Sequence, residues 1–170
     1  MVKTAYIGLL LLSMLISQEF VVQPYLQSAT PSSIYILWET DSNIESKVEW
    51  GTWQTLGEVT TGTAITSYGS NKLHTVQLTG LQTSMRYYYR VVTGSLTSEI
   101  YDFIMPPDPL SESSFKIVAM SDMQRDNSNP NKFEEIVHDG IITYLADNYF
   151  GDIPFDLQMV LVPGDLVDNG

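Results

Sequence analysis

The chain has 170 residues, of which 44% are hydrophobic and 16% are charged, so it has enough apolar material for one or two folded domains and no long polar tract typical of disorder. Its 20 acidic residues against 8 basic ones give a net charge of -12, which argues against the basic surface that nucleic-acid binding needs. It contains no cysteine, which excludes disulfides, thiol catalysis and thiolate metal sites.

Residues 1–18 have the pattern of a secretory signal peptide. Lys3 precedes an apolar run from Tyr6 to Ile16, and small and polar residues follow it. This run is too short for the ~20 residues of a membrane-spanning helix, but it suits the core of an export signal. The alternative, a buried N-terminal helix or strand, lacks amphipathic spacing. We expect a secreted or periplasmic protein with no integral membrane segment after cleavage.

Residues 19–105 are predicted to form a β-sandwich. Five segments rich in β-branched and aromatic residues alternate with clusters of Gly, Asn, Ser and Thr, and no helical period competes with them. The segments are Ser33–Trp38, Ser46–Trp50, His74–Leu78, Arg86–Val92 and Ser98–Met105.

Two features of this region resemble an immunoglobulin-like sandwich of the fibronectin type III kind. Trp38 lies on an early strand, where a large ring would fill the space between two sheets. LTGLQTSMRYYYRV is similar to the type III signature, because Leu81, Tyr87 and Tyr89 match its spacing, although Thr83 stands where the family has Pro. In such sandwiches a tyrosine hydroxyl anchors one corner. We therefore expect these aromatic residues to be structural rather than ligand-binding.

Residues 106–114 are predicted to be a linker, because Met105–Ser114 contains three prolines and three serines. Residues 115–170 follow a different pattern. FKIVAMSD and LQMVLVPGD are continuous apolar runs that end at Asp122 and Asp165. Such runs are typical of strands buried on both faces of a parallel sheet.

Between the two runs the sequence predicts a helix. Asn129 is a candidate N-cap, and Pro130 suits the first turn, where its missing N–H costs nothing. Apolar residues fall on one face: Phe133, Ile136, Val137, Ile141, Tyr144 and Leu145. Gly140 lies on the same stripe and is expected to let the helix approach the sheet closely. The right-handed crossover of this βαβ unit makes its strands parallel, so their carboxyl ends open on one edge.

Asp122 and Asp165 are therefore predicted to end neighbouring strands at the edge where open α/β sheets bind ligands. Two close carboxylates repel unless a cation lies between them, and their oxygens suit Mg, Mn, Fe or Zn. Either Asp alone would more simply cap or turn the chain, but the pair favours a metal site. His138, just beyond the apolar stripe of the helix, and His74, on a sandwich strand, are not expected to bind metal.

The motifs of residues 115–170 resemble those of the calcineurin-like metallophosphoesterases, and PYLQSATPSSIYILWET resembles the opening strands of the accessory sandwich of purple acid phosphatases. SDMQ stands where the family has Asp-x-His, and GDLVDNG matches its Gly-Asp-x-x-Asp-x-Gly. The resemblance implies that Asp122 ligates the first metal, that Asp165 bridges both metals, and that Asp168 orients a neighbouring ligand. Gln124, in place of the family's imidazole, is expected to be a weak ligand and to make the first site weaker or selective for a different ion.

The same resemblance implies two divalent or trivalent ions, Fe, Mn or Zn, in the complete protein, and hydrolysis of a small phosphate ester by a hydroxide bound to both; the fragment is not expected to bind both ions fully. Asp168 stands where purple acid phosphatases supply a tyrosinate, so we expect no purple charge-transfer colour. The family's further ligands, an Asn-His pair, another His and a Gly-His-x-His segment, do not occur before Gly170. No catalytic residue beyond the metal ligands is identified. We therefore expect the chain alone to be inactive.

The predicted fold is thus two-domain, an all-β immunoglobulin or fibronectin III-like sandwich followed by an incomplete α/β metallophosphoesterase portion, over residues 115–170, in a fragment of a longer enzyme. Two other interpretations stay open. The sandwich could be a secreted adhesion or carbohydrate-binding module, or the protein could be a catalytically dead phosphoesterase-like partner.

Overall fold

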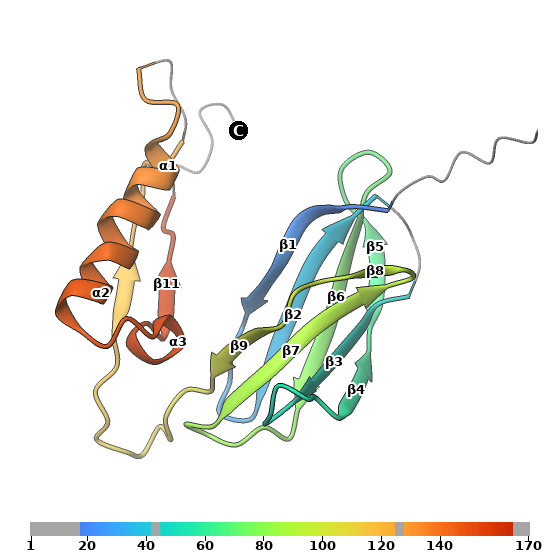
Figure 1. The fold of residues 1–170 in the computed structure, drawn as a ribbon, viewed down its shortest axis with the longest axis horizontal. Helices are drawn as coiled ribbons and strands as arrows, with labels where there is room; N and C mark the ends of the chain where they lie inside the picture. Colours follow the sequence, from blue (N-terminus) through green and yellow to red (C-terminus); the bar gives the residue numbers. More distant parts are fainter. Residues whose placement is uncertain (1–17, 42–44, 125–127, 165–170) are drawn as a thin grey trace, which may run out of the picture.

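The computed structural model describes residues 18–41, 45–124 and 128–164, which form a β-sandwich followed by a smaller α/β part (Figure 1). One antiparallel sheet has the order β1-β2-β6-β5, with β1 at Phe20–Gln27, β2 at Ser33–Thr40, β6 at Lys72–Thr79 and β5 at Thr63–Thr66. The other has the order β4-β3-β7-β8, with β4 at Glu58–Thr61, β3 at Lys47–Gly51, β7 at Arg86–Thr93 and β8 at Leu96–Thr97. Strand β9, Tyr101–Ile104, also pairs with β7.

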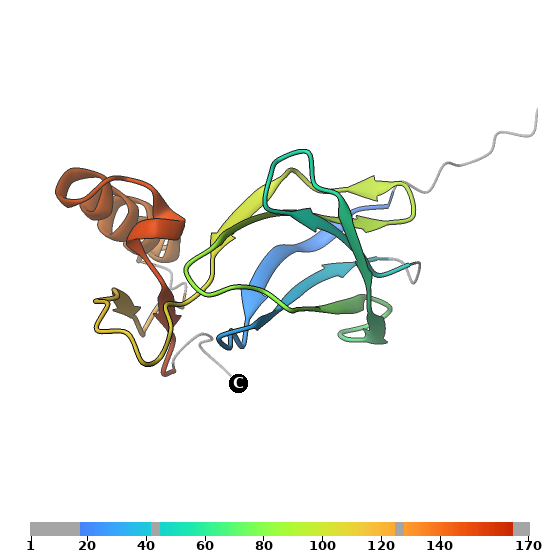
Figure 2. The ribbon, with the colours of Figure 1, turned by 90° about the horizontal axis from the view of Figure 1, so that it is seen from below.

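The two sheets lie face to face as separate layers, which Figure 2 shows from below. Their inward side chains form a single cluster, to which both sheets contribute. It consists of Ile34, Ile36, Trp38, Val48, Val76, Leu78, Leu81, Tyr87, Tyr89, Val91, Phe103 and Met105. The predicted all-β sandwich is confirmed, and the aromatic residues singled out in the sequence are core residues.

Four strands were not among the predicted segments, and one predicted segment is too long. Strands β1, β4, β5 and β8 were missed; β4 and β5 have four residues each, most of them exposed, so they lack a clear inward pattern. The segment predicted from Ser98 becomes a strand only at Tyr101. The Ser98 N–H donates to the Val91 carbonyl at 3.0 Å, but the Val91 N–H donates to the Ser98 hydroxyl at 3.0 Å, so a side chain replaces the backbone acceptor in one of these two bonds.

Trp38 joins the two sheets. Its Nε1 donates to the Thr93 hydroxyl of the opposite sheet at 2.9 Å, and its ring stacks on His74 with centroids 4.9 Å apart. The buried imidazole lies 2.8 Å from the hydroxyls of Thr40 and Ser46 through its two nitrogens. These polar groups are satisfied inside the core, as burial requires.

The corner between β6 and β7 is closed by Tyr87, as expected from the type III signature. The backbone N–H of Gln82 donates to the Tyr87 hydroxyl at 3.0 Å. The ring of Tyr87 packs on Phe103 and Trp50, so the side chain ties the corner to the core.

We expect Tyr87→Phe to lower the free energy of unfolding by about 1 kcal/mol, because it removes one hydrogen bond and keeps the ring. Chemical denaturation measures this change. Tyr88→Phe, at the neighbouring position on the opposite face of β7, is the control and should leave stability nearly unchanged. An equal loss in both variants would contradict the role of the corner.

Burial raises the pKa of Tyr89, and the nearby Tyr101 and Asp102 add to this effect. The phenol therefore stays neutral in the folded protein at a pH where the unfolded chain, with a pKa of about 10, is ionised. Its contribution to stability is fully present below pH ~10 and is lost as the pH rises above that value.

The free energy of unfolding should consequently fall above pH ~10, with up to about 1.4 kcal/mol per pH unit due to Tyr89. Tyr89→Phe should remove this part of the slope, whereas Tyr68→Phe, which changes an exposed ring, should keep it. Denaturant titrations between pH 8 and about 11 test the difference. Identical slopes in Tyr89→Phe and the parent would refute the assignment.

The α/β part contains two parallel strands, β10 at Ile117–Ala119 and β11 at Met159–Leu161, and the predicted parallel pairing is confirmed. The helix between them runs through α1 (Lys132–Glu134), the π-helical segment η1 (Glu135–Ile142) and α2 (Thr143–Asn148). A short helix, α3 at Ile153–Asp156, precedes β11. No helix that the structure describes is long and apolar enough to cross a bilayer.

Several details of this part differ from the prediction. The N-cap is Asn131, without a side-chain cap bond, and Asn129 instead donates to the Glu135 carboxylate at 3.1 Å. A Cβ added to Gly140 would meet only the Glu135 carbonyl of its own helix, at 3.6 Å, so this glycine does not mark a close approach to the sheet. Strand β11 is 44–47% exposed rather than buried, because two strands and one helix do not cover both faces.

Residues 105–116 form neither helix nor strand, as expected for a linker. Residues 1–17, which make up nearly all of the predicted signal peptide, lie outside the described residues. The predicted limits of the two domains stay a prediction.

Candidate metal site at the carboxyl ends of the parallel strands

Beyond β10 and β11 the two chain segments stay side by side. The Met120 N–H donates to the Leu161 carbonyl at 3.0 Å, which extends the strand ladder by one residue. Farther along, the Ser121 hydroxyl donates to the Gly164 carbonyl at 3.3 Å. The residues that directly precede Asp122 and Asp165 in sequence are therefore in contact at this edge.

Asp122 lies at the carboxyl end of β10 with an exposed side chain. Its backbone φ is 58°, in the left-handed region that non-glycine residues seldom occupy. Met123 follows with a buried side chain, which holds the loop against the α/β part. The loop is thus fixed by the buried Met123 side chain, which lies between the polar residues Asp122 and Gln124 in the sequence.

Gln124 is half-buried, and its Oε1 atom is buried with no hydrogen-bond partner among the residues that the structure describes. An unpaired buried amide oxygen is costly, and a cation would satisfy it. Asp122 and Gln124 together offer only oxygen donors, which suit hard divalent ions. These residues fit part of a metal shell.

The other predicted ligands cannot be placed from the structure. Asp165 and Asp168 lie outside the described residues, so their position beside Asp122 stays a prediction. Within the described ranges no group of three or more His, Asp or Glu side chains is placed to hold a metal. His138 lies on the helix surface with its Nδ1 3.3 Å from the Asp139 carboxylate.

A group of charged side chains lies at the amino ends of β10 and β11, opposite the candidate metal site. It was not predicted from the sequence. Asp156 is fully buried, and neither carboxylate oxygen has a hydrogen-bond partner among the described residues. The Lys116 ammonium lies 3.9 Å from Oδ1 and 4.5 Å from the centre of the Tyr149 ring. No sequence signal marks this pair, because an Asp in a short helix before a strand is ordinarily exposed.

We expect substitutions of Lys116 and of Asp156 to lower the stability of the α/β part by different amounts. Lys116→Met should destabilise the α/β part by up to about 3 kcal/mol, since it leaves a buried carboxylate without its counter-charge. This value is below that for a fully buried pair because Lys116 is partly exposed. Asp156→Asn should cost less, because the buried charge itself is removed.

Hydrogen exchange of the β10 and β11 amides measures this local stability. Lys132→Met, in helix α1 of the same part, is the matched control and should leave exchange unchanged. A larger loss of protection in Asp156→Asn than in Lys116→Met would contradict the interpretation.

Two antiparallel sheets packed face to face, a tryptophan between them and a tyrosine-closed corner define an immunoglobulin-like sandwich of the fibronectin type III kind. The family model for the purple acid phosphatase N-terminal domain matches residues 21–105. The chain therefore belongs to this family, and the resemblance inferred from the sequence is confirmed.

Solved structures are similar in fold. Purple acid phosphatase PPD1 from yellow lupin (Lupinus luteus) seeds superimposes with a TM-score of 0.52 and 17% identity, over 86% of this chain and 34% of that chain. PhoD gives 0.46 and 17%, over 62% and 24%. The sensor domain of the anti-sigma factor RsgI4 of Pseudobacteroides cellulosolvens gives 0.44 and 13%, over 59% and 100%. No curated protein matches the sequence.

The chain spans about a third of the lupin phosphatase and about a quarter of PhoD. At 17% identity and a TM-score of 0.52, the lupin structure shows a similar fold only. The 86% of the chain that superimposes on the lupin structure is more than the sandwich, which makes up about half of the sequence.

Proposed function

We propose that this chain is part of a metal-dependent phosphoesterase that hydrolyses a small phosphate ester. The observation that carries the proposal is the contact between Ser121 and Gly164, which joins the carboxyl ends of two parallel strands directly before the two predicted metal ligands. Asp122 and Asp165 each follow one of the two contacting residues directly in the sequence. A phosphatase origin is supported by the family of the sandwich.

The proposed ligands would have different roles, because their side chains differ in charge and position. The carboxylates of Asp122 and Asp165 would supply negative charge, and Asp165 would be shared by the two ions. The Gln124 Oε1 atom, buried and without a partner among the described residues, would add a neutral donor to the first ion. Asp168 would orient a neighbouring ligand. Two bound ions of Fe, Mn or Zn would neutralise charge on the phosphoryl group and activate water for attack.

The net charge of the whole chain, -12, favours a small substrate over nucleic acid, because it opposes a polyanion. The apolar N-terminal segment supports export to the periplasm or the cell exterior. In the position of the purple-type tyrosinate the chain has Asp168, so we propose a colourless metal centre. Further ligands would come from a longer protein.

Metal binding by the chain itself is the first test. Calorimetric titration with Mn²⁺ should show binding that Asp122→Asn weakens at least about tenfold, the lower end of the effect of losing even an outer partner of a ligand. Asp147→Asn removes the same charge from the exposed surface of α2 and should leave the affinity unchanged. Equal affinities in Asp122→Asn and the parent would overturn the site.

Hydrolysis is tested in a longer protein that carries this chain. Turnover of p-nitrophenyl phosphate should depend on added metal and should be abolished by Asp165→Asn. Metal binding without hydrolysis of any monoester or diester would refute the activity and favour the catalytically dead interpretation. Absence of both would leave the sandwich as the functional part.

A further inference from the structure

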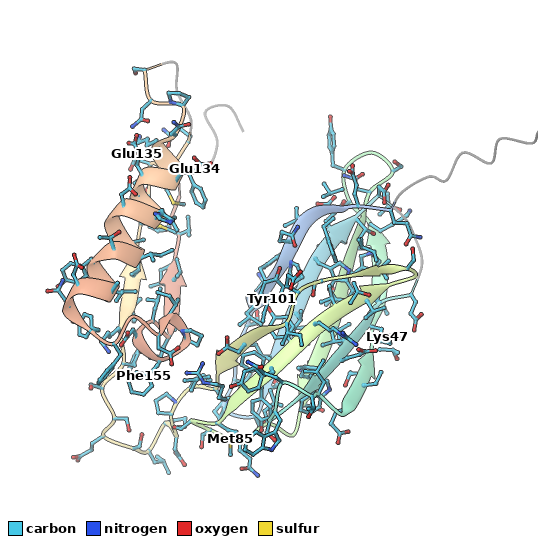
Figure 3. All side chains as sticks on the ribbon, viewed as in Figure 1. Lys47, Met85, Tyr101, Glu134, Glu135 and Phe155 are labelled. Atoms are coloured by element: carbon cyan, nitrogen blue, oxygen red, sulfur yellow. The ribbon has the colours of Figure 1, made fainter. Side chains whose placement is uncertain are left out.

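The junction between the sandwich and the α/β part includes a polar connection in addition to the linker. Helix α3 contacts β9, although the two elements are separated by the linker and the whole βαβ helix. Figure 1 shows the two parts near each other at α3 and β9 and farther apart toward α1. Met85 of the sandwich and Phe155 of α3, both labelled in Figure 3, mark the two sides of the junction.

Arg86 lies at the centre of this junction. Its Nη1 donates a hydrogen bond to the Oδ2 atom of Asp102 on β9, and its Nη2 donates to the Oδ2 atom of Asp152, directly before α3. One guanidinium thus binds one carboxylate from each part of the molecule. Its planar fork suits two acceptors at once, which a lysine would not reproduce.

Backbone contacts hold the groups on both sides in place. In the sandwich, the Met105 N–H donates to the Met85 carbonyl at 3.0 Å, next to Arg86. In the α/β part, the Asp152 carbonyl accepts bonds from the Phe155 and Asp156 amides at 2.9 and 2.7 Å, which fixes the start of α3. The hydrogen bond that Arg86 donates to Asp152 is the main reason why the pKa of Arg86 is raised.

Apolar packing between the two parts is incomplete. A groove of about 890 Å³ lies between them, lined by the β1–β2 turn, the linker and the start of β11. Leu26, Pro107, Phe115 and Met159 are among its walls, and the last two are about half exposed. Polar contacts therefore do much to fix the orientation of the α/β part relative to the sandwich at this junction.

We propose that Arg86 is an ionic latch that fixes the α/β part against the sandwich, and that its release lets the α/β part swing about the linker. The latch is a conformational device and does not depend on the proposed enzymatic function. Its three side chains are 30–42% exposed, so salt screens the pairs and should weaken the latch.

The chain contains a matched control for this latch. Arg90 lies four residues farther along β7, on the same face as Arg86. Its Nε and Nη2 atoms both lie 2.7 Å from the Glu49 carboxylate on β3. Arg90→Gln therefore removes an arginine pair that lies wholly within the sandwich.

The absence of cysteine permits site-specific spin labels at two introduced positions. Gln54→Cys, in the β3–β4 loop, and Ala146→Cys, on α2, are exposed and report on opposite parts. Double electron–electron resonance should give one narrow distance distribution in the labelled parent and in Arg90→Gln. Arg86→Gln and Asp152→Asn should each lose this narrow peak, and so should the parent in 1 M NaCl, where the Debye length is about 3 Å.

A narrow peak retained in both Arg86→Gln and Asp152→Asn would overturn the latch. Equal broadening in Arg90→Gln would also overturn it, because the effect would then reflect general loss of charge on β7. If Arg86→Gln unfolds the sandwich, as judged by circular dichroism, the distance distribution of Asp152→Asn decides the outcome, because Asp152 lies outside the sandwich.

Discussion

The alternation of side chains along β7 is the constraint on which much of the molecule depends. Tyr87, Tyr89 and Val91 point into the core, while Arg86 and Arg90 point outward and form ion pairs. Because the side-chain period of a strand is two, a shift by one residue would exchange these two sets. The strand is held against such a shift by β3 on one side and by β8 and β9 on the other. The tyrosine corner and the junction with the α/β part thus both depend on the same register of β7.

The sequence predicted the sandwich because its longer strands carry strong local signals. Trp38 and the tyrosines of β7 are large, regularly spaced and buried, so composition and periodicity agree with the packing. Strands β4 and β5 could not be predicted in this way, because their side chains mostly face solvent and their pairing comes from β3 and β6. At Ser98 a side-chain hydroxyl takes the place of a backbone acceptor opposite Val91, which no periodicity reveals.

In the α/β part the topology was predictable and the local detail was not. The handedness of a βαβ crossover fixes parallel strands whatever the helix does in between. The helix itself contains a π-helical segment, in which bonds run between residues five apart, so Ile136 and Ile141 align differently from an α-helix. The predicted N-cap was Asn129, whereas the helix begins after Asn131.

The residue types of the candidate site could be predicted from the sequence, but the contacts that hold the surrounding chain in place could not. Spacing alone singled out Asp122, whereas the Ser121–Gly164 contact spans 43 residues and the Arg86–Asp152 pair spans 66. Among the described residues, Lys116, Asp156 and Asp152 tie down the amino end of the α/β unit. The carboxyl end is held by the strand ladder, one hydroxyl contact and the buried side chain of Met123. The two ends of the unit are therefore held in different ways among the described residues: ion pairs act at the amino end, and backbone and hydroxyl hydrogen bonds act at the carboxyl edge.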